Sequence, residues 1–315
     1  MKKFFLLATL LAFCVTQLPA NEYSKNFMNG TPEIQSMSAL TFGPPGILFI
    51  SDAKNAAVFA VELGDQTPNT STEKLEIKNI EEKIASLLGT TASEVLIHDL
   101  AVNPISKNAY IAVSRGRSNW SSAWQLPNDL EDAKVLLKIT PDGQFEEVSL
   151  QNIRYSQAEI PNPINAEEKH RWKHISKRVD AITDIAYDDG KVYVAGLSNE
   201  EFASSLRVLS FPFEKAASAT TLEIYHAAHG KYETHAPIRT FLPYKINNES
   251  QLLASYLCTP LVTFPVASLQ NGTHLKGKTV AELGDGNYPL EMIAYKKGGK
   301  DYLLIAPTRR PLLRL

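Results

Sequence analysis

The chain has 315 residues, enough for one large all-β domain or two smaller ones, and its formal net charge is −2 at pH 7. A charge so close to zero excludes the overall basic field that recruits nucleic acid or acidic membrane surfaces. The 16 Gly and 18 Pro residues are spread along the chain, as a fold with many turns requires.

The N-terminal segment has the features of a secretory signal. Two lysines precede an apolar run from Phe4 to Val15, which is too short to span a bilayer, and polar residues follow Ala20. The sequence therefore predicts a signal peptide over residues 1–20 and a periplasmic or secreted mature chain over residues 21–315. No later segment is apolar for the length of a membrane span, so no integral membrane segment is expected after signal removal.

The cysteine pattern excludes an intramolecular disulfide in the mature chain. Removal of the signal takes away Cys14 and leaves Cys258 alone, at the end of an apolar run, where a small buried residue is expected. Lipid attachment at Cys14 is an alternative, although Phe13 stands where such signals have a small residue.

A repeated β-meander dominates the rest of the chain. Its clearest copy is the run I-T-D-I-A-Y-D-D-G-K-V-Y-V-A-G from Ile182, in which Asp188-Asp189-Gly190 marks a hairpin turn between two apolar strands. Similar units begin at Ser38, Ile97, Ile238 and Pro289. The positions taken as equivalent are Leu40, Leu100, Ile185, Phe241 and Ile293.

The spacing of these copies predicts an all-β fold, a five-bladed β-propeller. A four-stranded blade takes about 40–50 residues, and the one long interval contains two polar insertions, 115–132 and 152–179. Fourth strands are expected at 74–79, 144–150, 221–226 and 279–283. The last copy lacks a fourth strand, so residues 21–36 are expected to supply it and close the ring.

Two short helical insertions are also expected. Residues 80–88 place apolar side chains on one face and end before Gly89. Residues 165–179 begin at a capping Asn165, with acidic residues in the first turn and basic residues in the last.

The unit hydrophobic-x-D-[LI]-A-[VY], followed by a turn and x-[VI]-Y-[VI]-A, resembles the repeat of NHL and YVTN-type β-propellers. These belong with the quinoprotein amine dehydrogenase β-chain-like and SMP-30-like propellers. The resemblance implies the architecture but leaves activity open, because the family includes lactonases, dehydrogenase subunits and binding modules. The metal ligands of SMP-30-like lactonases are not matched, since Ser38-Ala39 stands where an early Glu is needed. The sequence also contains neither C-x-x-C-H nor G-x-S-x-G.

Polar residues at the start of each first strand give the candidate ligand site. In a propeller these strands line the central channel, so their first residues ring one mouth of it. The predicted ligand-binding residues at this mouth are His98, Asp99, Asp184, Arg239 and Glu291. Loops after the second strands add Arg115, Asn199 and Glu200. An anionic ligand would favour Arg239, whose guanidinium can hold a carboxylate by two hydrogen bonds.

The stretch Y-H-A-A-H-G-K-Y-E-T-H holds His226, His229 and His235, which are weak candidates for a metal site. The stretch follows a strand rather than a helix, which favours a hydrogen-bonded loop. We therefore predict no cofactor, with calcium or zinc as the alternative.

The sequence as a whole predicts an exported binding protein for a small polar molecule or a protein partner, without a nucleic-acid partner. The alternative is a propeller enzyme, either a lactonase or other hydrolase, or a periplasmic oxidoreductase subunit.

Overall fold

The computed structural model describes residues 22–70, 74–115, 134–170, 176–257, 260–284, 287–309 and 311–315. The expected signal peptide with Cys14, most of the insertion 115–132, and Cys258 lie outside these residues. None of the helices in the described ranges is long and apolar enough to cross a membrane.

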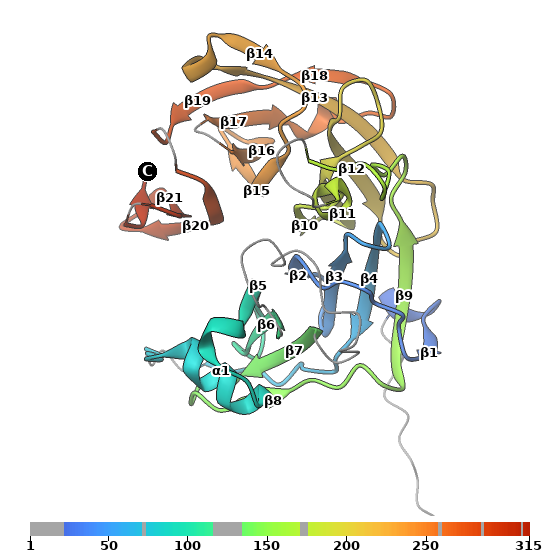
Figure 1. Ribbon diagram of the computed structural model, residues 1–315, viewed down its shortest axis with the longest axis vertical. Helices are drawn as coiled ribbons and strands as arrows, with labels where there is room; N and C mark the ends of the chain where they lie inside the picture. The colour runs from blue at the N-terminus through green and yellow to red at the C-terminus, as the bar shows by residue number, and fades with distance from the viewer. Residues whose placement is uncertain are drawn as a thin grey trace, which may run out of the picture.

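Five small, mostly antiparallel sheets stand around a common centre and form a five-bladed β-propeller (Figure 1). Blades are numbered here in chain order. The strands of blade 1 are β2 (Leu40–Phe42), β3 (Ile47–Asp52), β4 (Ala57–Glu62), β9 (Ile153–Glu159) and β1 (Met28–Gly30). Those of blade 2 are β5 (Leu96–Val102), β6 (Ala109–Ser114), β7 (Lys134–Ile139) and β8 (Phe145–Glu147). Those of blade 3 are β10 (Asp184–Asp188), β11 (Lys191–Leu197), β12 (Ser204–Ser210), β13 (Ser218–His226), β14 (Lys231–Glu233) and β18 (His274–Lys276).

The last two blades follow the same plan. The strands of blade 4 are β15 (Ile238–Ile246), β16 (Glu249–Tyr256), β17 (Pro260–Pro265) and β19 (Lys278–Glu282). Those of blade 5 are β20 (Pro289–Lys297), β21 (Lys300–Pro307) and β22 (Leu313–Arg314). The helical elements are α1 (Ile80–Leu88) and the 3₁₀ turns η1 (Glu22–Ser24), η2 (Ala92–Glu94), η4 (Lys177–Asp180), η5 (Ala227–His229) and η6 (Val266–Ser268).

The blades do not follow one another around the ring in chain order. The inner strand β2 lies between β5 and β10, and β15 lies between β10 and β20. The order around the ring is therefore blade 2, 1, 3, 4, 5. Blade 2 is inserted between the third strand of blade 1, β4, and its fourth strand, β9, which pairs with β4 from Ala57↔Glu159 to Val61↔Tyr155.

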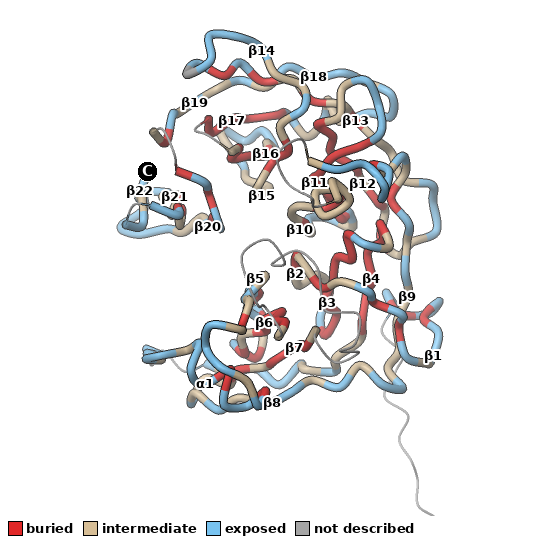
Figure 2. The backbone as a smooth tube through the Cα atoms, viewed as in Figure 1, coloured by how far each residue is buried: buried red, intermediate tan, exposed pale blue. Residues whose placement is uncertain are grey.

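The core consists of the layers between neighbouring blades, and it is densest along the second and third strands (Figure 2). In blade 2 the alternate residues of β6 face opposite sides. Tyr110 and Ala112 pack against blade 1, whereas Ile111 and Val113 pack under α1. α1 therefore covers the outer part of the blade 2 face that points away from blade 1.

The helix at 80–88 is confirmed, including its end at Gly89, which has φ +65° and donates its N–H to Ala85 O. The prediction of a strand at residues 74–79 is wrong. Residues 74–79 form no strand, because Ile77 packs into the apolar cluster under α1, and β9 takes the fourth place in blade 1. The other three expected fourth strands correspond to β8, β13 and β19.

The expected closure of the last blade by residues 21–36 is also wrong. The strand in this segment, β1, pairs with β9 through Met28↔Tyr155 and Gly30↔Ile153, at the outer edge of blade 1. The sheet of blade 5 consists of β20, β21 and β22 in the described residues, so β22 forms its outer edge.

The helix expected at 165–179 is not found in its described parts. Lys169 pairs with Ser176 as an isolated bridge, and the backbone N–H of Lys177 donates to Glu168 O over 2.7 Å. These cross-segment contacts engage the backbone groups that a continuous helix would need. The side chain of Asn165 instead accepts a hydrogen bond from the N–H of Glu167 in a local turn.

Candidate functional site

Three of the five innermost strands, β5, β10 and β20, present a carboxyl-bearing residue directly before an apolar one. Asp99 and Asp184 each accept a hydrogen bond on Oδ1 from the N–H of the next residue, over 2.7 Å in both cases. Glu291 accepts the equivalent bond from Met292 over 2.6 Å. Met292, not Ile293, is therefore equivalent to Leu100 and Ile185.

The misalignment of the fifth copy comes from a local match in sequence, because Ile293-Ala294-Tyr295 repeats Ile185-Ala186-Tyr187 one residue out of register. The pairing of β20 with β21 shifts register between Pro289 and Glu291, and similar irregularities occur in β5 and β15. Each β-bulge adds one residue to the inner strand, which a count of residues along the sequence does not reveal.

The two aspartates join neighbouring blades. Asp99 of blade 2 accepts the N–H of Leu40 in blade 1 over 2.6 Å, and Asp184 of blade 3 accepts the N–H of Phe241 in blade 4 over 2.8 Å. The aspartate in the repeated D-[LI]-A motif thus has a structural role, because both its oxygens are engaged by backbone donors.

Four of the five junctions between blades are tightly packed. Leu40 packs against blade 2, Ile185 against blade 1, Phe241 against blade 3 and Met292 against blade 4. The exposed fraction of these four side chains is 3–5%.

Within the described residues, the fifth junction, between blades 5 and 2, is open. Leu100, the equivalent residue of blade 2, is 46% exposed. It points away from blade 1, because it pairs with Ile111 on the face that α1 partly covers. Ile293 of blade 5 points away from blade 4 and is 53% exposed. The two side chains therefore face the same gap from opposite sides.

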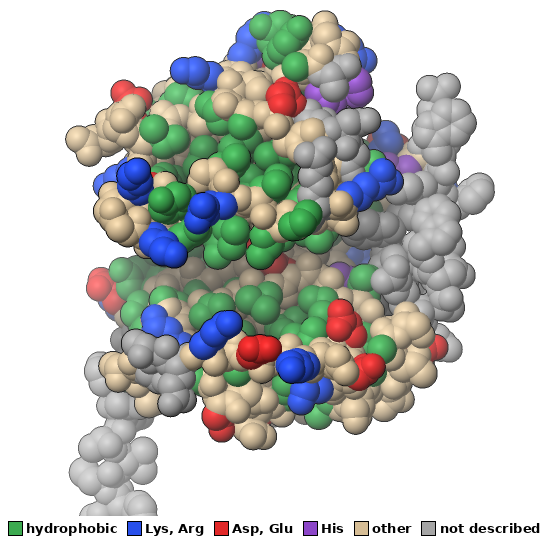
Figure 3. Space-filling model, turned by 90° about the vertical axis from the view of Figure 1, so that its left-hand side faces the viewer, with side chains coloured by type: hydrophobic (Ala, Val, Ile, Leu, Met, Phe, Trp, Pro, Cys, Tyr) green, Lys and Arg blue, Asp and Glu red, His purple; other side chains and the backbone are tan. Residues whose placement is uncertain are grey.

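This gap, which we call the open-junction cleft, has apolar walls. Figure 3 shows it as a horizontal hollow between the two halves of the molecule, with hydrophobic side chains on both sides. The exposed apolar side chains that belong to its two inner strands are Ile97, Leu100 and Val102 of β5 and Leu290 and Ile293 of β20.

Three carboxyl groups converge where the inner strands meet. A hydrogen bond joins the carboxyl groups of Asp99 and Glu291, which lie on the two strands that border the cleft. Asp184 is close enough for its carboxyl group to interact electrostatically with both. Thr240 Oγ1 also donates to Glu291 Oε1 over 3.3 Å. The cleft therefore has a carboxyl pair, Asp99 and Glu291, at its inner end.

These carboxyl groups hold protons more strongly than usual. Burial, and then the negative charge of Glu291, raises the pKa of Asp99 and of Asp184 well above the ordinary value. Burial also raises the pKa of Glu291, against the opposing hydrogen bond from Met292. Because a hydrogen bond between two carboxyl groups needs a proton, the pair shares one when it is intact.

His98 lies beside this group but has a different partner. Its Nε2 is 2.9 Å from Ser114 Oγ, and burial lowers the pKa of His98 to about 4. The ring is therefore neutral near pH 7 and can both donate and accept a hydrogen bond.

Arg239 points to a separate ion pair. Its guanidinium lies 3.6 Å from Asp180 Oδ1, and His170 Nε2 is 3.1 Å from the other oxygen of Asp180. The structure thus brings Asp99, Asp184 and Glu291 together. Arg239 lies one residue before Thr240, which contacts Glu291, and is instead paired with Asp180.

The predicted loop residues are dispersed. Arg115 Nη1 donates to Leu88 O over 2.8 Å, at the end of α1. Glu200 Oε1 accepts a hydrogen bond from Asn162 Nδ2 over 2.5 Å, and the N–H of Asn199 donates to Asn162 O over 3.1 Å. Asn199 and Glu200 are exposed on the loop after β11.

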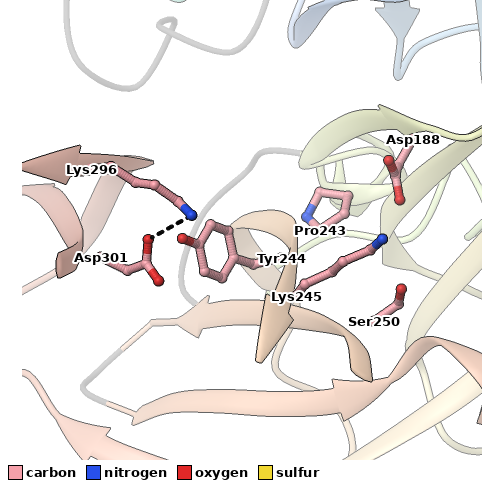
Figure 4. Close-up of a pocket in the computed structure, with 7 residues that line it drawn as sticks. All are labelled: Asp188, Pro243, Tyr244, Lys245, Ser250, Lys296 and Asp301. Atoms are coloured by element: carbon pink, nitrogen blue, oxygen red, sulfur yellow. Dashed lines mark ion pairs between the residues drawn. The ribbon is translucent and has the colours of Figure 1, made fainter. Parts of the chain in front are cut away.

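A second polar concavity lies at the other end of the inner strands. This pocket has a volume of about 290 Å³, and its walls come from blades 3, 4 and 5 (Figure 4). Lys296 Nζ lies 3.5 Å from Asp301 Oδ1, and Tyr244 forms a hydrogen bond to Asp301. Its other lining residues are Asp188, Pro243, Lys245 and Ser250. The sequence pattern at the strand starts does not reveal this pocket, because its residues lie toward the ends of the inner strands and at the starts of the second strands.

The histidine-rich stretch forms a compact group at the outer edge of blade 3. His226 Nδ1 and His229 Nδ1 lie 3.0 Å and 2.7 Å from the two carboxylate oxygens of Glu233. His235 is exposed and contacts Thr234 Oγ1 over 3.0 Å instead.

Comparison with known proteins gives only distant similarity. No protein-family model matches the chain, and no curated protein sequence matches it. The chain is similar to extracellular domains 1–2 of Drosophila Semaphorin 1b, with 7% identity over 88% of this chain and 75% of that one, at a TM-score of 0.35. It is also similar to a Bacteroides ovatus protein described as xyloglucan PUL GH43B, with 11% identity over 68% of this chain and 36% of that one, at a TM-score of 0.32.

A gluconolactonase from Xanthomonas campestris is a further propeller of this kind, with 13% identity over 82% of this chain and 64% of that one, at a TM-score of 0.27. The chain spans about a third of the Bacteroides ovatus protein. Similarity this low carries no argument about the ligand or the activity of the present chain.

Proposed function

We propose that the protein is an exported NHL/YVTN-type β-propeller that acts as a binding module, and that its ligand enters the open-junction cleft. The observation that supports this most strongly is the contrast between junctions. Apolar side chains that four junctions bury are exposed at the fifth, directly beside a carboxyl pair with raised pKa values. An apolar concavity with a few convergent polar groups is the usual form of a small-molecule site.

The chemistry of the cleft defines the ligand class. Ile97, Leu100 and Ile293 offer contact to an apolar body, whereas Asp99 and Glu291 accept hydrogen bonds from a polar head. An ammonium group satisfies this site best, because it replaces the shared proton by three donors and a positive charge. A hydroxyl head is second, and a carboxylate head is repelled. Arg239 contributes little to this preference, since Asp180 already neutralises it.

Three ligands with one apolar body test this order. We expect phenethylammonium to bind more tightly than 2-phenylethanol, and 3-phenylpropionate to bind most weakly, by isothermal titration calorimetry at about pH 7. A charge-assisted hydrogen bond contributes ~1.5–3 kcal/mol, so the ammonium should bind roughly 10–100-fold more tightly than the alcohol.

Two variants locate the site. Glu291→Gln should reduce the advantage of the ammonium over the alcohol, because it removes one of the two carboxyl groups at the inner end of the cleft. Lys245→Ala, in the pocket at the opposite end of the strands, should leave all three affinities unchanged. Equal affinities for the three ligands, or a response to Lys245→Ala but not to Glu291→Gln, would contradict the proposal.

A hydrolase is the second candidate, because a shared proton between two carboxyl groups can divide the roles of general acid and general base. Such an enzyme should hydrolyse a chromogenic glycoside or a lactone, and the activity should be lost in Glu291→Gln. Turnover by the unmodified protein that Glu291→Gln does not change would argue against a catalytic role for this pair.

Export is proposed from the sequence of residues 1–20. The intact mass of protein recovered from the periplasm or medium should correspond to a chain that begins near Asn21. A retained Cys14 with a mass increase of a lipid would instead show membrane anchoring.

A further inference from the structure

The geometry points to a site for a divalent transition-metal ion, with zinc as the best match, formed by His226, His229 and Glu233 at the outer edge of blade 3. One donor atom from each of the three residues lies within 4.8 Å of the other two. The site is separate from the open-junction cleft and does not depend on the function proposed for it.

The fold brings the three side chains together by a β-hairpin with a 3₁₀ turn at its tip. His226 is the last residue of β13 and pairs with Lys231, while Ile224 pairs with Glu233. Because side chains alternate along a strand, His226 and Glu233 project from the same face of the hairpin. The turn η5 then carries His229 back over this face, and Gly230 at φ +63° allows the reversal.

The spacing of the donor atoms suits a small cation. The Nδ1 atoms of His226 and His229 lie 3.0 Å and 2.7 Å from Glu233 oxygens, and the two rings have centroids 4.0 Å apart. Zinc ligands at about 2.0–2.2 Å in a tetrahedron lie about 3.3 Å from one another. The donor atoms lie within 4.8 Å of one another, so side-chain adjustment on the hairpin would bring them around one ion.

Charge and burial also fit a metal site. Burial of Glu233 opposes ionisation, but hydrogen bonds from His229 and His226 hold its pKa below the usual value, so it is a carboxylate at neutral pH. His226 is only 2% exposed, whereas the side chain of His229 is 47% exposed. Two imidazole nitrogens and one carboxylate form a ligand set that leaves a fourth position open to water on the solvent side.

One competing arrangement is an ion pair in which a protonated histidine and Lys231, whose Nζ lies 3.8 Å from Glu233 Oε1, neutralise the carboxylate. A bound metal would displace this ion pair, so stoichiometric metal binding distinguishes the two arrangements.

The test is a titration of chelator-treated full-length protein with Zn²⁺ and Co²⁺ at about pH 7.5. We expect one equivalent of each metal to bind and Co²⁺ to give the intense visible absorption of a tetrahedral site. Loss of an outer partner costs ~10–100-fold in metal affinity, so loss of a direct ligand in His229→Ala or Glu233→Gln should cost at least as much.

His235→Ala is the matched control, because His235 lies two residues after the hairpin and its ring contacts Thr234 rather than Glu233. It should bind Zn²⁺ like the unmodified protein. His229 is chosen over the buried His226 because its removal leaves the fold intact, which circular dichroism checks. Absence of stoichiometric binding, or equal affinities of His229→Ala, Glu233→Gln and His235→Ala, would overturn the assignment.

Discussion

Replacement of Glu291 by glutamine should make the protein more stable at alkaline pH and less sensitive to pH. The glutamine side chain keeps an oxygen for the donors Thr240 Oγ1 and Met292 N, which both use Oε1 of Glu291 in the native protein. Its amide can donate to Asp99 without the shared proton that the native pair needs. The variant therefore removes the negative charge of the carboxyl group and keeps its hydrogen bonds.

The sign of the effect follows from the raised pKa values. The folded protein holds protons on Asp99, Asp184 and Glu291 more strongly than the unfolded chain does. Their contribution to the free energy of unfolding is complete below the ordinary aspartate value of 3.8 and is lost as the pH rises through the raised values. His98 acts in the opposite direction, since its lowered pKa weakens the fold as the pH falls from 6.5 to about 4. His98 contributes equally to both proteins, so its effect cancels when their free energies of unfolding are subtracted.

The magnitude comes from the repulsion that the variant removes. Two carboxylates about 4 Å apart repel each other by ~4 kcal/mol at an effective dielectric constant near 20, and the protein avoids part of this by keeping a proton. We expect Glu291→Gln to gain ~1–2 kcal/mol at about pH 8 and close to nothing at about pH 5.

Urea unfolding of both proteins at several pH values measures this difference directly. Glu201→Gln, on an exposed loop, is the control for a loss of one negative charge and should show no pH-dependent gain. A Glu291→Gln protein that is equally or less stable at about pH 8, with a difference that does not change with pH, would refute the coupling of the carboxyl groups.

Three further substitutions test the junctions and the core by urea unfolding. Asp184→Asn should lower the free energy of unfolding by ~1–3 kcal/mol at about pH 5, because an amide has one acceptor oxygen for two backbone donors, Ile185 N and Phe241 N. No loss would show that this link between blades is unimportant. Arg207→Met should cost ~3 kcal/mol or more, since this fully buried guanidinium donates to three backbone carbonyls, and an unchanged midpoint would contradict that role. Gly196→Ala should destabilise by a similar amount, because its Cβ would lie 2.1 Å from Ala181 O, and native-like stability would show that the backbone there can move.

The number of blades is predictable from the sequence because each blade is a local unit. The D-[LI]-A motif and the hairpin turn lie within about 15 residues, so one copy can be recognised without the others. The ring order is not predictable. It depends on β9, which pairs with β4 across more than 90 positions of chain, and the polar alternation of Ile153–Glu159 is compatible with any free sheet edge.

The candidate site is predictable in part. The repeat alone assigns Asp99, Asp184 and Glu291 to one channel mouth, and the structure brings their carboxyl groups together. The one-residue error in the fifth copy arises because Ile293-Ala294-Tyr295 repeats Ile185-Ala186-Tyr187 in sequence but not in structural position. The alignment therefore predicts that Ile293, like Leu100, packs between neighbouring blades. Their exposure depends on the gap between blades 5 and 2, which sequence does not encode locally.

The most direct test of the open-junction cleft is a methyl-detected NMR titration of the isotope-labelled protein with phenethylammonium. We predict that the methyl signals of Leu100 and Ile293 shift together and saturate at one equivalent, since these side chains face the same gap from blades 2 and 5. The backbone amide signals of Tyr244 and Lys245, in the pocket at the other end of the strands and recorded on the same sample, should not respond. Shifts confined to the surroundings of Tyr244, or none at Leu100 and Ile293 when binding is complete, would contradict the central claim.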